Sequence, residues 1–565
     1  MTAISLVFMR RAYEVAFVVL LAALTAQAWR RRGALDRKLL AAVGAALVAG
    51  ALTLLIARVP FEPAHDHNTF IARADCAYDR SCVAVPRGAW GLPSMAAYGL
   101  LLRALPYRLL TLSVVSLALT ALDAALLVAL VRALAARTTL RAHAPAAGAL
   151  AGLFLVSHPA LARVAAADTM WPFALACLLA AALSTLGACA PDAAPWEPAA
   201  ALGAFGFAMA SNHVFMALAP MVLLAPWAWS TASLRPRAST VPALILWALL
   251  LAPSALDVAQ SLFQRGDHGG QASRLSEALG LFVPGARETI LYFDPRVTPR
   301  SWALLCLLGL GVALWRPVVP FVVVAVAWLV TEVPLGGQVP LDGGYPTRYV
   351  HGFASHFFAS TFAALGAVIA LDRARKWWPV AAVVMAVAAL LPWPLSRESV
   401  AFARERRPLS LEARAVSSAF DHLPPCDVIV VPPEIQDDMG CAHRGSDPVE
   451  AIFQSGELRW VYQRRGLRPP QVVPANIFSD ERARGRRVLF YEGSVYHTFI
   501  PCESRERRIP ASLERPLLTR FRARFTLTPA RTFTVTTAQH RFAELRVMAD
   551  RVPSLTLGFY WLRPR

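Results

Sequence analysis

Long apolar runs recur along the first 395 residues of this chain, and they constrain its fold more than any other feature. A helix needs about 20 mostly apolar residues to cross a bilayer. Runs that approach this length lie near 12–29, 39–57, 109–131, 145–158, 169–189, 199–210, 213–230, 239–255, 301–315, 318–333, 351–371 and 377–395. The chain has 565 residues, 56% of them hydrophobic and 16% charged, and its mean hydropathy is +0.46. This composition is too apolar for a soluble protein of this size and predicts a polytopic α-helical membrane protein of about 11–12 spans.

Basic residues gather in alternate short connections between these runs, namely 30–38, 132–141, 235–237, 316 and 373–376. Because Lys and Arg favour the cytoplasmic side, these connections are predicted to be cytoplasmic. The outer loops are then 58–92, 159–168, 257–300 and 334–350. The net charge of +19 follows from topology and from proximity to anionic lipid, so no nucleic-acid partner is expected. Arg10 and Arg11 do not fit, unless the first run lies in the interface and eleven runs span the membrane.

The composition changes after residue 395. Helical spacing at 408–416 is followed by short buried-strand patterns at 426–433 and 486–493, and the alternation of 525–537 and 540–549 is typical of paired strands. We therefore expect a soluble, extracytoplasmic α/β domain over 396–565, long enough to bury its own core. It has no Gly-rich phosphate loop, nucleophilic Ser elbow or zinc-spaced Cys/His set, which favours a structural or substrate-presenting role.

The first outer loop carries the candidate chemistry of the membrane part. Asp66 lies a few residues beyond an apolar run, at a level where a carboxylate can reach the head group of a substrate whose lipid tail stays in the membrane. It is a candidate general base, or a solvated carboxylate that pairs with Arg73. His65 and His67 lie on one side of an extended segment, where they either bind a divalent metal or form hydrogen bonds only.

Two cysteines share this loop with Asp66. Cys76 and Cys82 are predicted to face the oxidising side of the membrane, so we expect them to form a disulfide that closes a small loop. Two unpaired thiols are the alternative, because spacing alone does not fix connectivity.

Three further segments carry a family resemblance: GLPSMAAYGLLLRAL at 91–105, VSHPALARVAAADTMWPFALACLL at 156–179 and GGYPTRYVHGF at 343–353. In layout and in these motifs, residues 39–395 resemble the GT-C class of integral-membrane glycosyltransferases, which includes the protein O-mannosyltransferases and the lipid A aminoarabinose transferases. The acidic pair that is frequent in the first loop of that class is absent, and His67 stands where the second acid is expected. The resemblance implies transfer of a sugar from a polyprenyl-phosphate donor to a protein, lipid or glycan acceptor, at the outer face of a bacterial-type inner membrane.

Such a transfer needs a base for the acceptor hydroxyl and positive groups for the departing phosphate. With Asp66 as the base, Asp168 orients the site or binds the acceptor, or instead caps the helix that follows it. Arg348, next to Tyr349, is the candidate phosphate ligand because a guanidinium matches phosphate oxygens in pairs, and snorkelling to lipid head groups is its alternative role.

The third outer loop adds further positive charge. Its arginines Arg287, Arg296 and Arg300 are candidates for an outer lid over the phosphate. A loop of this length is more often functional than not.

Two other functions remain open at this stage, a polytopic transporter or lipid flippase and a non-catalytic assembly protein whose outer domain binds a partner. Charges are scarce inside the apolar runs, Asp123 being one of few, and no inverted repeat is evident, which disfavours a transporter. An enzyme must bring loops 58–92, 159–168 and 334–350 to one cavity, whereas a transporter need not. The position of these loop ends is therefore the discriminating observation.

Overall fold

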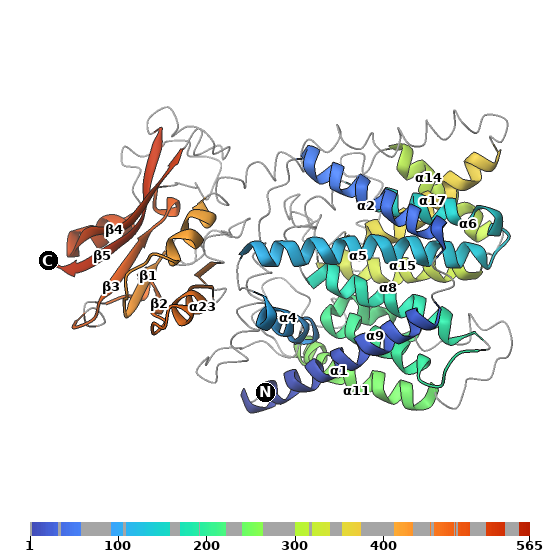
Figure 1. The fold of residues 1–565 in the computed structure, drawn as a ribbon, viewed down its shortest axis with the longest axis horizontal. Coiled ribbons are helices and arrows are strands. Elements are labelled where there is room, and N and C mark those ends of the chain that lie inside the picture. Colours follow the sequence, from blue (N-terminus) through green and yellow to red (C-terminus); the bar gives the residue numbers. More distant parts are fainter. Residues whose placement is uncertain are drawn as a thin grey trace. The chain divides into compact units, whose positions relative to one another are not determined.

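The computed structural model describes residues 3–31, 36–57, 92–105, 109–158, 170–190, 192–221, 240–263, 300–315, 319–338, 353–373, 412–432, 452–453, 457–479, 481, 484–497, 516–536 and 553–565. They form two compact units, one drawn mostly from residues 1–400 and the other mostly from 401–565. The first is helical and the second is built on a β-sheet (Figure 1).

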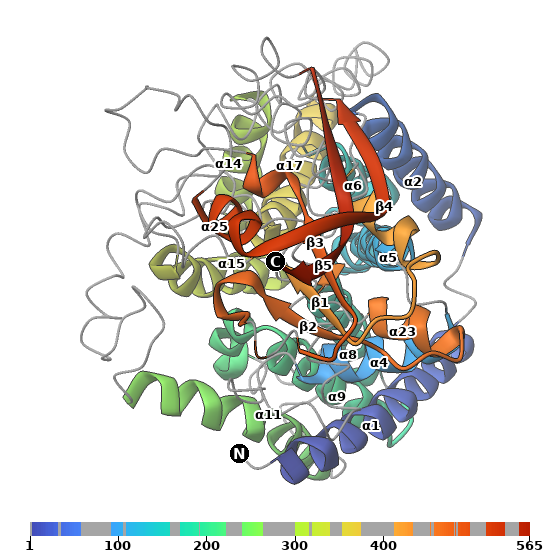
Figure 2. The same cartoon turned by 90° about the vertical axis from the view of Figure 1, so that its left-hand side faces the viewer.

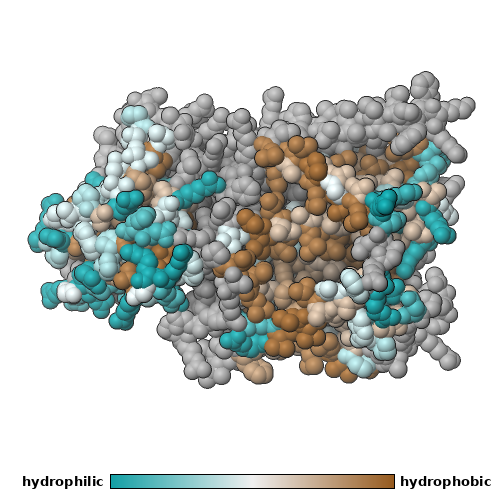
Figure 3. Space-filling view, viewed as in Figure 1, coloured by the Kyte–Doolittle hydropathy of each residue, from teal (hydrophilic) through white to brown (hydrophobic). Residues whose placement is uncertain are grey.

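The helical unit follows the predicted apolar runs closely. Its elements are α1 (Ala3–Arg30), α2 (Arg37–Ala57), α4 (Leu92–Ala104), α5 (Leu109–Ala136), η2 (Arg141–His143), α6 (Ala144–Val156), α8 (Met170–Ala188), α9 (Glu197–Ser211), η3 (His213–Leu218), α11 (Thr240–Phe263), α14 (Arg300–Trp315), α15 (Val319–Gln338) and α17 (Phe353–Arg373). In the described part, four helical segments are long and apolar enough to cross a membrane: Phe8–Arg30, Arg37–Leu55, Val114–Ala136 and Trp171–Ala188. Figure 3 shows the broad apolar surface of this unit in brown.

Some predicted boundaries need correction. The run at 213–230 begins as the 3-10 helix η3, α11 continues past the predicted loop start at 257, and α15 continues past 334. The backbone hydrogen bonds of a helix persist through polar residues, so the end of an apolar run does not fix the end of its helix. The predicted run at 377–395 lies outside the described residues.

Small residues let the helices of this unit approach closely. A Cβ added to Gly309 of α14 would collide with the carbonyl oxygen of Phe362, and one added to Gly366 of α17 would collide with that of Leu305. Glycine pairs of this kind allow direct backbone contact between apolar helices, where no hydrophobic effect drives association in lipid. The contact holds the middle of α14 against the middle of α17.

One end of the helical unit gathers the connections that were predicted to be cytoplasmic. Glu197, at the start of α9, is fully buried and accepts hydrogen bonds from Gln27 Nε2 at 2.9 Å, Arg30 Nη1 at 3.1 Å and Arg31 Nη2 at 3.0 Å. Arg31 also donates to the backbone oxygen of Gly187 at the end of α8. The ends of α1 and α8 and the start of α9 therefore meet at one buried carboxylate.

The neighbouring connections join the same end through further ion pairs. Arg132 of α5 pairs with Asp36, which precedes α2, and His143 Nε2 lies 3.1 Å from an Asp372 carboxylate oxygen of α17. Arg137 donates to the backbone oxygen of Leu186 at 3.0 Å. Residues 27–36, 132–143, 186–197 and 372 thus form one charged end of the helical unit.

Arg10 and Arg11, which did not fit the charge pattern, are neutralised locally. Arg10 Nε lies 3.0 Å from Glu14 Oε1, Arg11 Nη1 lies 2.8 Å from Glu14 Oε2, and Arg10 is 2% exposed. A paired arginine carries little weight in a count of loop charges. The segment Phe8–Arg30 is also long and apolar enough to span, which favours a spanning first run over an interfacial one.

The second unit is an α/β domain, as predicted. Its strands are β1 (Val428–Val431), β2 (Gln471–Pro474), β3 (Val488–Glu492), β4 (Phe525–Thr536) and β5 (Ser554–Pro564). They lie in the order β2-β1-β3-β5-β4, with β1, β2 and β3 parallel and β4 and β5 antiparallel to their neighbours (Figures 1 and 2). Two apolar cores, one around Phe420 and Phe559 and the other around Phe490 and Phe521, contain side chains of alternate positions of β1 and β3.

Helices complete this unit. A helix over 412–420, α23 (Glu457–Arg464) and α25 (Pro516–Arg524) flank the sheet. The strands predicted at 426–433 and 486–493 contain β1 and β3. The predicted strand at 525–537 is β4, and it pairs with β5 over 554–564. Its predicted partner at 540–549 lies outside the described residues, so that pairing stays a prediction.

Candidate active site

Most residues predicted from sequence for the site lie outside the described part of the chain. These are Asp66, Asp168, Arg348, Tyr349, Arg296, His65, His67, Cys76 and Cys82. Arg300 is described and is the exposed first residue of α14. The geometry of the site must therefore be built from the helix ends that carry these loops.

Two buried histidines join two of the outer loops. His158, just after α6, and His356, in the first turn of α17, stack with ring centroids 3.8 Å apart and an interplanar angle of 30°. Trp302, in the first turn of α14, lies 5.8 Å from His158 and 4.8 Å from Phe154, centroid to centroid. The two histidines and Trp302 are at most 4% exposed, so this is a packed junction of three helix ends.

The junction fixes the helix ends from which the predicted catalytic loops depart. His158 directly precedes the loop with Asp168, His356 follows Arg348 by eight residues, and Trp302 follows Arg300 by two. A stack of aromatic rings holds its partners at a defined distance. One end of each of the second, third and fourth predicted outer loops is therefore held at this junction.

The first outer loop begins and ends at the same end of the unit. In α2, a Cβ on Gly50 would lie 3.2 Å from the Val156 Cβ, so the last turns of α2 run beside the end of α6. After the loop, Tyr98 of α4 packs on Phe173 in the first turn of α8, with centroids 6.1 Å apart. The loop that carries Asp66 thus leaves and re-enters the helices beside the roots of the other outer loops.

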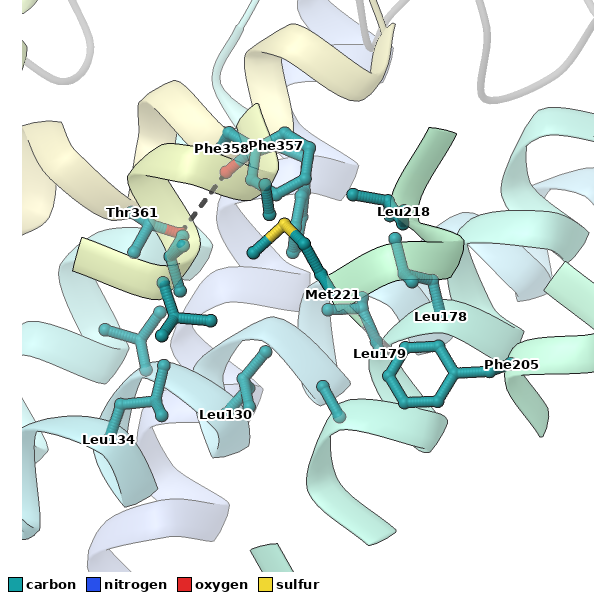
Figure 4. Close-up of a pocket in the computed structure, with 15 residues that line it drawn as sticks. Leu130, Leu134, Leu178, Leu179, Phe205, Leu218, Met221, Phe357, Phe358 and Thr361 are labelled. Atoms are coloured by element: carbon teal, nitrogen blue, oxygen red, sulfur yellow. Dashed lines mark hydrogen bonds between the residues drawn. The ribbon is translucent and has the colours of Figure 1, made fainter. Parts of the chain in front are cut away.

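An apolar pocket lies next to this junction. It has a volume of about 90 Å³ and is lined from α5, α8, α9, α15, α17 and the turns after α9 by residues that include Leu130, Leu178, Met221, Val323 and Phe357 (Figure 4). Its one hydroxyl, that of Thr361, donates to the Phe357 backbone oxygen at 3.4 Å. Apolar cavities of this kind stay dry and accept apolar ligands. Phe357 and Phe358 follow His356 directly, so one helix presents a polar ring to the junction and apolar rings to the pocket.

Asp123 is the charged residue that stands apart from this arrangement. It lies in the middle of α5, is fully buried, and neither carboxylate oxygen has a hydrogen-bond partner among the described residues. Ionisable residues within membrane spans are rare and mark functional sites by default. The sequence pointed to Asp123 by its position in an apolar run, but gave it no partner.

The second unit holds a buried polar cluster that sequence reasoning missed. At the carboxyl end of β3, Glu412 Oε1 accepts hydrogen bonds from the Tyr491 hydroxyl at 2.6 Å and the Ser494 amide at 3.0 Å. Burial raises the pKa of Glu412, and these hydrogen bonds oppose the shift. Only the pattern of single acids next to strand and helix ends could have indicated this cluster.

The neighbouring acid of the cluster is shifted in the opposite direction. Glu492 Oε1 lies 2.9 Å from His497 Nε2 and 2.6 Å from Arg522 Nη2. Burial raises the pKa of Glu492, but the bonds from His497 and Arg522 outweigh it and leave the pKa below its ordinary value. Two buried carboxyls at one strand end thus have pKa values shifted in opposite directions.

Metal binding stays a prediction for the first outer loop. The described residues contain no group of three or more His, Cys, Asp or Glu side chains that could hold a metal ion, and His65 and His67 lie outside them. None of the cysteines in the described part, Cys177, Cys189, Cys306 and Cys426, forms a disulfide. Cys426 is buried with its sulfur 3.3 Å from the Tyr462 hydroxyl, and burial raises the pKa of its thiol to about 11.

Comparisons with known proteins give one kind of match. No protein-family model and no curated protein matches the chain. Four solved chains do, among them the crystal structure of ArnT from Cupriavidus metallidurans bound to undecaprenyl phosphate, with 14% sequence identity, a TM-score of 0.43, and coverage of 81% of this chain and 93% of that one. ArnT is a lipid A aminoarabinose transferase of the GT-C class, the class that the sequence motifs resemble.

Proposed function

We propose that this protein transfers a sugar from a polyprenyl-phosphate donor to an acceptor at the outer face of a bacterial-type inner membrane. The observation that carries this proposal is the junction of His158, His356 and Trp302, from which the loops with Asp168, Arg348 and Arg300 depart. A transferase needs its base and its phosphate ligands gathered around one reacting carbon. Loops that depart from adjacent helix ends can bring these groups together.

The apolar pocket supports the choice of donor. A polyprenyl-phosphate sugar is an amphiphile, with a long apolar tail and an anionic head. The helix α17 places His356 at the junction and Phe357 and Phe358 at the pocket, so polar and apolar surfaces follow one another within a turn. We propose that the pocket takes part of the isoprenoid chain while the phosphate sugar lies among the outer loops.

Each loop then has a chemical role. Asp66 takes the proton of the acceptor hydroxyl as the new glycosidic bond forms at the anomeric carbon. Arg348 and Tyr349 bind the donor phosphate, which leaves with the bonding electrons of the broken C–O bond.

The remaining candidates support this exchange. Arg296 and Arg300 add positive charge around the leaving group, and Asp168 orients the acceptor. A divalent metal held by His65 and His67 is an alternative source of charge stabilisation. The domain at 396–565 is proposed to lie on the same outer side, as a structural or substrate-presenting domain.

The test is transfer from a labelled polyprenyl-phosphate sugar by the purified full-length protein in detergent, with donor affinity measured separately. Asp66→Asn keeps the size of the side chain but cannot take a proton, so we expect turnover to fall by about 10²–10⁴-fold while donor binding persists. Arg348→Ala removes a charge that contacts the donor before and during transfer. It should weaken donor binding as well as turnover.

The two variants separate the possible failures. Near-normal turnover of Asp66→Asn would move the base elsewhere, with Asp168 as the next candidate. Unchanged donor affinity in Arg348→Ala would remove the phosphate-binding role. Flipping of a labelled lipid with no sugar transfer by the unmodified protein would instead support the transporter function, for which Asp123 is the residue to replace.

A further inference from the structure

Arginines collect at one edge of the β-sheet in the second unit, the edge at which the parallel strands β1, β2 and β3 begin. The set, named here the arginine edge, comprises Arg464, Arg465, Arg468, Arg484, Arg486, Arg487, Arg524, Arg563 and Arg565. All nine are exposed. They come from four separate stretches of the sequence, 464–468, 484–487, 524 and 563–565, so only the fold brings them together.

Backbone and side-chain contacts show how the parallel part of this edge is assembled. Arg468 lies three residues before β2, and Arg487 directly precedes β3. The backbone amide of Asp427, just before β1, donates to the Arg487 carbonyl at 2.8 Å. Arg465, at the end of α23, donates to the Leu423 carbonyl at 2.8 Å, which ties it to the approach to β1.

The antiparallel strands continue the row. Leu489 of β3 pairs with Trp561 of β5, so this register places Arg487 opposite Arg563. The Arg565 amide donates to the Arg524 carbonyl at 3.1 Å, where β4 begins. Arginines therefore flank four of the five strands at one edge.

Acidic residues do not balance this charge. In the described part of the second unit, Glu412, Glu457 and Glu492 are buried, and the exposed acids are Asp421, Asp427 and Glu481. Asp427 is paired with Arg487 at 3.4 Å. Nine exposed arginines facing three exposed acids give this edge a strongly positive potential.

The spacing of the row indicates an extended ligand. Neighbouring strands lie about 4.8 Å apart, so the arginines at β2, β3, β5 and β4 form a row of guanidinium groups across the sheet, with Asp427 at β1 between the first two strands. A guanidinium binds carboxylate or phosphate oxygens in pairs. Such a line matches a chain with repeated negative charges better than a single anion.

The residues between the arginines disfavour a membrane surface or a protein partner. A membrane-binding surface buries apolar side chains among its basic residues, and a protein interface has an apolar core. The one large hydrophobic residue that is strongly exposed in the described part of this unit is Ile477, which follows the opposite end of β2. Gln463, Gly466 and Gly485 are exposed at the arginine edge.

We propose that the arginine edge binds an extended anionic glycan that carries carboxylate or phosphate groups on successive sugars. The ion pairs across successive strands would hold the glycan along the edge of the sheet. This binding is independent of the transfer reaction proposed for the helical unit, and it gives the second unit a function of its own.

The test measures binding of polygalacturonate, a carboxylated glycan, to the full-length protein in neutral detergent, with dextran as the uncharged comparison. We expect binding of polygalacturonate alone, weakening as salt rises because bound counterions are no longer released favourably. The double variant Arg468→Glu/Arg486→Glu should lower the affinity by roughly tenfold or more. The control Arg414→Glu/Arg531→Glu changes the net charge equally at exposed positions away from the edge, and should bind almost as well as the unmodified protein.

Three results would overturn the proposal. Equal losses in both double variants would show that net charge alone governs binding. Retained affinity in the edge variant would place the glycan elsewhere. Binding to vesicles that contain phosphatidylglycerol, without binding to polygalacturonate, would identify a lipid surface as the partner. Hydrogen exchange of β1 and β3 in each variant shows whether the sheet remains folded, and none of these outcomes depends on sugar transfer.

Discussion

The two units treat their charged residues in opposite ways. In the helical unit, Arg10, Arg31 and Arg132 are paired with Glu14, Glu197 and Asp36. In the described part of the second unit most arginines are exposed, while three glutamates are buried and hydrogen-bonded. Burying a charge without a partner is costly, whereas an arginine in water needs no partner. Arginine therefore stabilises the helical unit through ion pairs and is exposed for ligand binding on the second unit.

The largest effect is expected at Glu197, whose side chain is fully buried and faces two arginines. Glu197→Gln removes the charge that Arg30 and Arg31 face and keeps the size of the side chain. Breaking a fully buried pair costs about 3–5 kcal/mol. Arg30 and Arg31 are 44% and 31% exposed, so we expect a loss of about 2–3 kcal/mol here, seen as a lower unfolding temperature in detergent.

Asp192→Asn is the matched control for Glu197→Gln. Its carboxylate lies 3.9 Å from the same Arg31 but is 78% exposed, so the unfolding temperature should hardly change. A similar loss in both variants would mean that the charged end is stabilised by long-range charge balance and not by the buried carboxylate.

A smaller effect is expected in the second unit. Glu492→Gln leaves one acceptor for His497 and Arg522 but removes the charge of both hydrogen bonds. Hydrogen bonds to charged groups contribute about 1.5–3 kcal/mol, and Arg522 is 40% exposed, so a loss of about 1–2 kcal/mol is expected. Hydrogen exchange of the β3 amides in the full-length protein measures it.

The two buried glutamates of the second unit should make its stability depend on pH in opposite directions. The pKa of Glu492 is lowered on folding, so its stabilisation is present above the ordinary carboxyl pKa of about 4.3 and is lost as the pH falls through the lowered value. The pKa of Glu412 is raised, so its favourable contribution is present below the ordinary value and is lost as the pH rises through the raised one. In the unmodified protein, hydrogen-exchange protection of the β3 amides should therefore decline toward both acid and alkaline pH. Glu492→Gln should remove the decline at acid pH, and Glu412→Gln should remove the decline at alkaline pH. Identical pH profiles in the two variants would contradict these opposite shifts.

The sequence predicted the helices and strands of the fold better than the contacts between them. Apolar runs near 39–57 and 351–371 located α2 and α17 within a few residues, because bilayer thickness and apolar length are both local properties. The stack of His158 on His356 joins residues 198 positions apart, and no local pattern indicates it. The enzyme hypothesis required loops 58–92, 159–168 and 334–350 to converge, but the sequence did not show it; the described helix ends next to the second and fourth loops lie side by side at the histidine stack. The arginine edge was missed because its members are adjacent only across strands.

The smallest effect is expected at Asp36, where an ion pair and a helix cap share one side chain. Asp36 pairs with Arg132, and its Oδ1 accepts the Leu39 amide at 2.8 Å at the start of α2. The hydrogen bond from Arg132 is the main cause of the lowered pKa of this carboxyl, so its contribution is present above the ordinary carboxyl pKa and fades as the pH falls through the lowered value. Asp36→Asn keeps a capping oxygen and loses only the charge, so its unfolding temperature should fall less than that of Glu197→Gln, and less in high salt than in low salt. Asp36→Ala loses the cap as well and should show a further decrease that salt does not remove. If Asp36→Asn were as damaging as Glu197→Gln, exposed and buried pairs would contribute alike at this end, and the contrast between the two units would have to rest on something other than desolvation.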